Sequence, residues 1–197
     1  MRRELAIALV VVGCGPPAAP SPSCPSGTHL DAARASAIET RLASVDEGRA
    51  WIDAARARVS AICFGSVSSP SVITTDRTVV LSSALEEGEA AARLGHLLVH
   101  AREGLPTDMV GRGQGDATCD AAVERALTLE ARAYVVEVSL QAALGAHPIT
   151  LAFEFTDEMR AAPRTQREAI ALAYLHAHPD GGPGIDGLES AYRALCR

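Results

Sequence analysis

Two histidines, His96 and His100, are the residues of this sequence whose type and spacing most clearly suggest chemistry. They are four positions apart, and in a helix such residues lie on one face with Cβ atoms about 6 Å apart. Both imidazole rings could then reach one metal ion, because imidazole nitrogen is a common zinc ligand. The spacing therefore predicts a metal site, with zinc as the candidate cofactor, provided that this segment is helical.

The segments around the histidine pair have the composition needed to position it. Thr78–Leu81 is rich in β-branched and apolar side chains, which predicts a strand. The residues from Ser83 to Glu86 fit the capping-box pattern, so we expect a helix to follow and to stop at Gly104. After a polar loop, a second long helix should run from about Asp116 to Leu144.

This order of elements resembles the zincin metallopeptidases, in which a strand leads into a helix with the motif H-E-x-x-H and a second helix follows. In the branch of that family with a glutamate ligand, a glutamate on the second helix completes the zinc site. The resemblance assigns this role to Glu130, whose neighbours one helical turn away carry no charge, and it leaves Glu124 and Glu137 as alternatives. It covers residues 72 to 144 and implies a zincin-like helical core.

The sequence departs from the family's motif at Leu97. This position follows the first histidine, where the family has a glutamate that takes a proton from zinc-bound water and delivers it to the leaving amine. Leucine can do neither, and such general acid–base catalysis is typically worth about 10²–10⁴ in rate. A non-catalytic, zincin-like binding or structural domain is therefore the expected function, with no catalytic residue assigned.

Two other functions stay open. The first is a zinc-dependent peptidase or other hydrolase with an atypical base, for which Glu89, Glu103 or a residue of the loop 105–118 is a candidate. The second is a helical structural domain without metal. In that case His96 and His100 would belong to the solvated polar face of an amphipathic helix.

The whole chain predicts a mainly α fold with a small β-sheet or hairpin, an α+β class, in one domain over residues 28–197. Thr28 should cap the first helix, and Gly48 is the position where that helix could break. The expected order is a long helix over 28–60, two or three short strands within 61–82, the two helices described above, an irregular stretch over 146–163 and two shorter helices over 164–177 and 185–195.

Four cysteines, Cys24, Cys63, Cys119 and Cys196, are expected to form two disulfides, because an even number in an exported domain is typical of disulfide bonding. Three pairings are possible. We prefer Cys24–Cys63 and Cys119–Cys196, because each bond would fasten one end of the domain to its middle.

The first fourteen residues have the pattern of an export signal. A positively charged start, Met1 to Arg3, precedes the apolar run Leu5–Val12, which is far shorter than the ~20 residues that span a bilayer. The run ends in Val11-Val12-Gly13-Cys14, which resembles the lipobox of bacterial lipoproteins. This resemblance implies that residues 1–13 are a signal peptide and that Cys14 is acylated and attaches the chain to a membrane.

Residues 14–27 are rich in proline, serine and alanine, which predicts a semi-extended tether between the anchor and the domain. Gly15 stands where enteric lipoproteins retained in the inner membrane have aspartate, so the resemblance favours the outer membrane, with the domain facing the periplasm or the cell surface. The formal net charge of −6 argues against nucleic acid as a partner.

The anchor hypothesis predicts the outcome of Cys14→Ser. Without the thiol that carries the lipid, the chain should leave the membrane fraction or remain as an uncut precursor. Fractionation and intact-mass measurement of the expressed protein test this. Unchanged processing together with unchanged membrane attachment would contradict the prediction.

Overall fold

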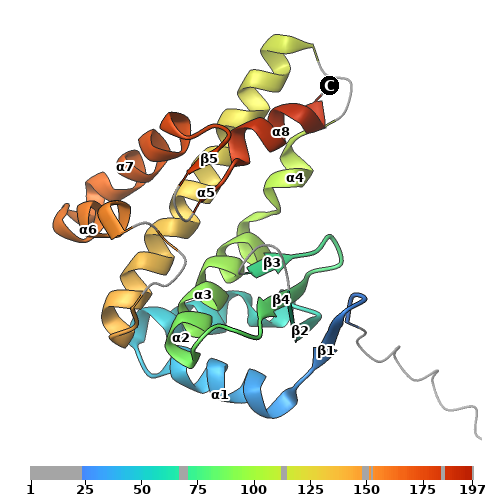
Figure 1. Ribbon diagram of the computed structural model, residues 1–197, viewed down its shortest axis with the longest axis vertical. Helices are drawn as coiled ribbons and strands as arrows, with labels where there is room; N and C mark the ends of the chain where they lie inside the picture. The colour runs from blue at the N-terminus through green and yellow to red at the C-terminus, as the bar shows by residue number, and fades with distance from the viewer. Residues whose placement is uncertain are drawn as a thin grey trace, which may run out of the picture.

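The computed structural model describes residues 24–66, 71–111, 115–147, 151, 153–182 and 185–196. The predicted signal peptide, Cys14 and most of the predicted tether lie outside these residues. The described chain is mostly helical with a small mixed sheet, so the predicted α+β class is confirmed. Figure 1 shows the sheet with α1, α2 and α3 in one part of the molecule and α6, α7 and α8 in another, with the long helix α5 between them.

The N-terminal part forms a strand and two helices, so the prediction of one long helix capped by Thr28 is wrong. Thr28 lies in the strand, and Asp31 caps the first helix by accepting a hydrogen bond from the backbone N–H of Arg34 at 2.9 Å. The break does not occur at Gly48. There, a Cβ would lie 2.1 Å from the carbonyl oxygen of Leu42, so glycine allows the two helices to pack closely. The elements are β1 (Thr28–Leu30), α1 (Ala32–Ala43), α2 (Asp46–Ala55) and η1 (Arg56–Arg58).

The predicted short strands within residues 61–82 are confirmed. They are β2 (Ala61–Gly65), β3 (Ser71–Ile73) and β4 (Thr78–Ser82). Together with β1 they form a four-stranded sheet in the order β1-β2-β4-β3, in which β2 and β4 are parallel and the other pairs are antiparallel. The two central strands are apolar and almost completely buried, as expected for strands covered on both faces.

Helices α3 (Glu87–Glu103) and α5 (Asp116–Leu144) are the two long helices that the sequence predicts. The predicted capping box is wrong, because the backbone N–H of Ser83 still donates to Gly65 of β2 and Glu86 is the N-cap. The helices approach closely at Gly95, where a Cβ would lie 2.1 Å from a methyl carbon of Leu140. This close packing sets the distance between the side chains that the two helices present to each other.

Besides α5, the described chain after α3 contains two helices that the sequence did not predict and two that it did. The unpredicted ones are α4 (Pro106–Met109), within the expected loop, and α6 (Phe153–Ala161), within the stretch expected to be irregular. The bounds of α7 (Arg164–Ala177) are confirmed. The last helix, α8 (Leu188–Cys196), begins three residues later than predicted, because β5 (Gly181–Gly182) and β6 (Ile185–Asp186) form a short hairpin before it.

Two apolar clusters flank α5. The first joins the sheet, α1, α2 and α3 to one face of α5, through residues that include Leu129, Val136 and Leu140. The second joins another face of α5 to α6, α7 and α8, through residues that include Val123 and Leu127. A helix that is apolar on two faces is suited to the interior of a protein. α5 is therefore the element that holds the two parts together.

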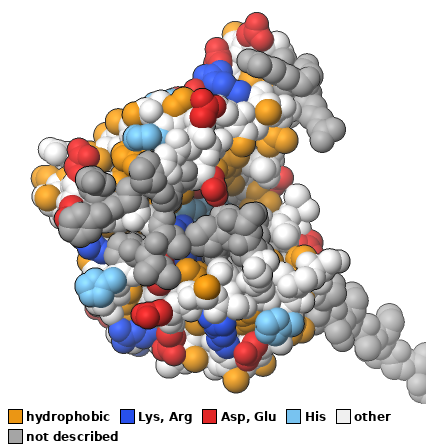
Figure 2. All heavy atoms as spheres, viewed as in Figure 1, with side chains coloured by type: hydrophobic (Ala, Val, Ile, Leu, Met, Phe, Trp, Pro, Cys, Tyr) orange, Lys and Arg blue, Asp and Glu red, His pale blue; other side chains and the backbone are white. Residues whose placement is uncertain are grey.

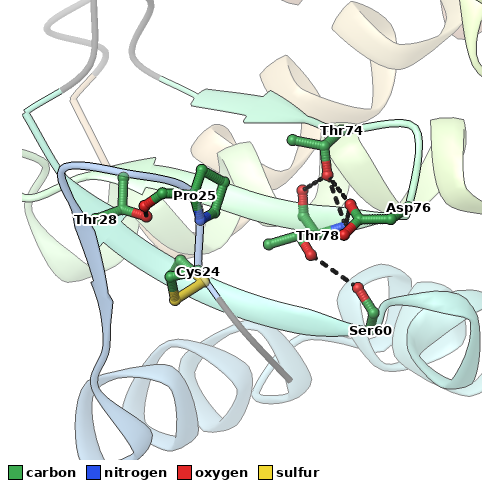
Figure 3. Close-up of a disulfide and its surroundings, with 8 residues drawn as sticks. Cys24, Pro25, Thr28, Ser60, Thr74, Asp76 and Thr78 are labelled. Carbon is green, nitrogen blue, oxygen red and sulfur yellow. Dashed lines mark hydrogen bonds between the residues drawn. A yellow bond between two sulfur atoms is a disulfide. The ribbon is translucent and has the colours of Figure 1, made fainter. Parts of the chain in front are cut away.

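Both predicted disulfides are confirmed, with the preferred pairing of Cys24 with Cys63 and Cys119 with Cys196. Figure 3 shows Cys24 beside the sheet, so the end of the predicted tether is attached to the central strand β2. Two intact disulfides fit a protein that is exported to an oxidising compartment. Within the described part of the chain, no helix has both the length and the apolar composition required to cross a lipid bilayer.

Candidate metal centre

The structure brings His96 and His100 of α3 together with Glu130 of α5 in a cluster that could hold a metal ion. Their ligand atoms form a nearly equilateral triangle. The two Nε2 atoms are 3.1 Å apart, and Oε2 of Glu130 lies 3.4 Å from each of them. The prediction that these three side chains converge is confirmed.

The size of this triangle fits one ion bound by all three atoms. Zinc binds imidazole nitrogen and carboxylate oxygen at about 2.0–2.2 Å, so two ligand atoms at the tetrahedral angle are about 3.3 Å apart. The three observed separations of 3.1, 3.4 and 3.4 Å lie close to that value. An ion could therefore enter without a large movement of either helix.

His96 has the second contact that is typical of metal-binding histidines. Its Nδ1 atom is 3.0 Å from Oε2 of Glu137, which lies about two helical turns beyond Glu130 on α5. When Nδ1–H donates to this carboxylate, the lone pair of Nε2 is directed at the cluster, and the carboxylate increases the basicity of the ring. Glu137 is held in turn by Arg93 at 3.0 Å and by the side-chain amide of Gln141 at 3.1 Å.

Glu130 is oriented by Tyr192 of α8. The tyrosine hydroxyl donates a hydrogen bond of 2.6 Å to Oε1, the carboxylate oxygen that does not face the histidines. Burial and the charge of Glu130 raise the pKa of Tyr192, so its hydroxyl stays protonated and remains a donor. Oε2 is left as the oxygen directed at the two imidazoles.

His100 differs from His96 in its second contact. Its Nδ1 atom is buried and has no hydrogen-bond partner among the residues that the structure describes. Its Nε2 atom, by contrast, faces both His96 and Glu130. A bond from Nε2 to a metal would therefore be the strongest interaction that fixes this ring.

The charges buried between α3 and α5 also fit a divalent cation. The carboxylate of Glu137 is paired with Arg93 at 3.0 Å, whereas the carboxylate of Glu130 faces the two imidazoles and the hydroxyl of Tyr192. Uncompensated charge in a protein interior is costly, so protons or a cation must balance it. One divalent ion bound by the neutral histidines would do so.

The contacts within the cluster also shift the pKa values of His96 and Glu130. Burial disfavours protonated His96, but the hydrogen bonds and charges of Glu130 and Glu137 outweigh burial and raise its pKa. Burial likewise disfavours ionised Glu130, but the charges and hydrogen bonds of His100 and His96 outweigh it and lower the pKa of this carboxyl. The cluster thus favours positive charge at the position where a metal would bind.

The remaining predicted residues have other roles in the structure. Glu124 is half exposed and pairs with His176 at 3.1 Å, so it is not part of the cluster. Glu137 contacts His96 from behind rather than completing the triangle. Leu97 is buried in the first apolar cluster. Glu103, a candidate base, is bound by Arg132 at 2.5 Å on the surface.

The polar stripe of α3 is not a solvated face, which corrects the interpretation of this helix as amphipathic. Glu89, Arg93, His96 and His100 are each no more than 6% exposed. Arg93 and both histidines face α5, whose carboxylates Glu130 and Glu137 are their partners. Arg93 and Tyr192 were missed as parts of the site. Arg93 lies on the same helical face as His96, so the sequence offered a signal for it. Tyr192 lies 62 residues from Glu130 along the chain, and no local pattern in the sequence indicated it.

Comparison of the chain with protein-family models, with curated proteins and with solved structures finds no match.

The buried pair of Arg93 and Glu137 predicts a large effect of Arg93→Met on stability. Removing the guanidinium leaves the Glu137 carboxylate buried without its charge partner, a change that typically costs about 3–5 kcal/mol. Urea unfolding of the chelator-treated protein should show this decrease. Arg132→Met is the matched control, because Arg132 is 44% exposed by side chain and its ion pairs should contribute less than about 1 kcal/mol. Equal effects of the two substitutions would contradict the prediction.

Proposed function

We propose that this chain is an exported lipoprotein whose domain binds zinc through His96, His100 and Glu130, and that it serves as a binding or structural module rather than a peptidase. The observation that carries the proposal is the buried triangle of two Nε2 atoms and one carboxylate oxygen with separations of 3.1, 3.4 and 3.4 Å. The hydrogen bonds that orient His96 and Glu130 support it.

Zinc suits this donor set better than magnesium or calcium does. The latter two prefer sites made of oxygen atoms, with six or more ligands, whereas two imidazoles and a carboxylate are typical of zinc. Bound there, zinc would supply positive charge and Lewis acidity. The protein residues would orient the ligands and exclude water.

A zincin-like core is part of this proposal. A strand, β4, leads into the helix with both histidines, and the glutamate comes from the next long helix, as the resemblance implies. Position 97 is what separates this chain from an active member of that family. Leu97 offers no proton acceptor, and Glu137, the other carboxylate in contact with His96, is already held by Arg93 and Gln141.

The attachment of Cys24 to the sheet limits the distance between the proposed anchor and the domain. Ten residues separate Cys14 from Cys24, and a chain of that length spans at most about 35 Å. The domain would thus stay close to the membrane, which we propose is the outer membrane. The scattered basic side chains on the face in Figure 2 agree with the expectation that nucleic acid is not a partner.

Zinc titration of the purified chain, with its disulfides formed, tests the proposed function. We expect one equivalent to bind and His96→Ala to abolish binding, whereas His176→Ala, which changes an exposed histidine, should leave it intact. As the pH falls, protons compete with the metal for the nitrogen of His96. Because the pKa of His96 is raised, release of the metal should begin at a higher pH than it would for a histidine ligand with an ordinary pKa. Lack of zinc binding by the wild type would contradict the proposal.

The proposed lack of peptidase activity is tested on a mixed peptide library. The zinc-loaded wild type should cleave no more than a sample treated with a chelator, because no general base stands at position 97. Robust cleavage that the chelator abolishes would favour the alternative function, a hydrolase with an atypical base.

A further inference from the structure

The C-terminal helix α8 reaches the proposed metal site through one side chain. Tyr192 is 6% exposed, and its hydroxyl donates to Oε1 of Glu130 at 2.6 Å. A carboxylate whose two oxygens are both free can rotate or bind in a bidentate manner. With Oε1 engaged by the hydroxyl, Oε2 is held toward His96 and His100.

The disulfide between Cys119 and Cys196 lies on the same contact between helices. Cys196 is four residues after Tyr192, so the two side chains share one face of α8. Glu130 is eleven residues after Cys119, which is close to three full turns, so these two side chains share one face of α5. The disulfide and the hydrogen bond therefore join the same faces of the same two helices.

The first turn of α8 is held by the contacts of Glu189 with His176 and of Ser190 with Asp180, but the polar contact between its last turn and α5 is weak. Arg193 pairs with Asp120 of α5, but their side chains are 39% and 63% exposed, and such surface pairs contribute about 0–1 kcal/mol. The buried covalent bond is thus the main restraint on the last turn of α8, next to the apolar packing of Tyr192 in the second cluster.

We propose that Tyr192 is a positioning residue for the zinc ligand Glu130 and that the Cys119–Cys196 disulfide holds it in place, so that zinc affinity depends on this disulfide. The inference depends on the proposed function, since it concerns the same site. The inference gives the Cys119–Cys196 disulfide a role in zinc binding that the Cys24–Cys63 disulfide does not have. Cys24–Cys63 joins the start of the described chain to the sheet, in a small cluster with Ala61 and Val80 that includes no residue of α3 or α5.

The experiment measures the zinc dissociation constant of the full chain by competition with a chromogenic chelator. Tyr192→Phe, which keeps the ring and the disulfide, should weaken binding by about 10–100-fold, the usual effect of losing a group that orients a ligand. The double variant Cys119→Ser, Cys196→Ser should show a similar loss. Adding Tyr192→Phe to it should cost little more, because both changes remove one interaction.

Two matched controls separate positioning from general stability. Tyr174→Phe removes a hydroxyl from a tyrosine that packs against the second apolar cluster. The double variant Cys24→Ser, Cys63→Ser removes the other disulfide. Neither should change the dissociation constant by more than about twofold, if zinc affinity depends on the contact between Tyr192 and Glu130 and on the disulfide beside it.

The outcomes distinguish this inference from the proposed function. If the wild type binds no zinc, both are wrong. If the wild type binds zinc and Tyr192→Phe binds it equally well, only the inference is wrong. If far-UV circular dichroism shows that the Cys119→Ser, Cys196→Ser variant does not fold, or if both disulfide variants lose affinity alike, the disulfide acts on folding and its proposed positioning role is wrong.

Discussion

The contact between α3 and α5 is the constraint on which the rest of this structure depends. It buries Glu130 and Glu137 of α5 together with Arg93, His96 and His100 of α3, so that charged groups lie in the interior. No apolar packing can offset such charge, because the interior solvates ions poorly. Some of it is balanced by the Arg93–Glu137 pair. We propose that a divalent cation between His96, His100 and Glu130 balances the remainder.

The surrounding fold is arranged to keep this polar layer between two apolar ones. The sheet, α1 and α2 pack against α3, while α6, α7 and α8 pack against the opposite side of α5. Gly95 allows the two central helices to approach closely enough for their side chains to form the 3.1–3.4 Å triangle. The ligands are therefore presented by rigid elements rather than by loops, which keeps their separations within a narrow range.

The sequence predicted those features that depend on local pattern. Histidines at i and i+4 had to share a helical face, and the glycines after α3 and α5 marked their ends correctly. Prediction from the sequence failed where contacts between distant segments determine the structure. Ser83 looked like a helix cap, yet its backbone is bound to β2. The polar stripe of α3 looked solvated because its partners, such as Glu137, lie on a distant helix. Tyr192 had no local signal, since its partner Glu130 lies 62 residues away.

The most direct test of the central claim is the X-ray absorption spectrum of the chain loaded with one equivalent of zinc, measured at the zinc edge. The account predicts a first shell of two imidazole nitrogens and oxygen atoms at about 2.0–2.2 Å, with the outer-shell scattering typical of imidazole rings. It also predicts no sulfur ligand, because Cys24, Cys63, Cys119 and Cys196 are in disulfides. A shell of oxygen atoms alone, or one with sulfur at about 2.3 Å, would contradict the account.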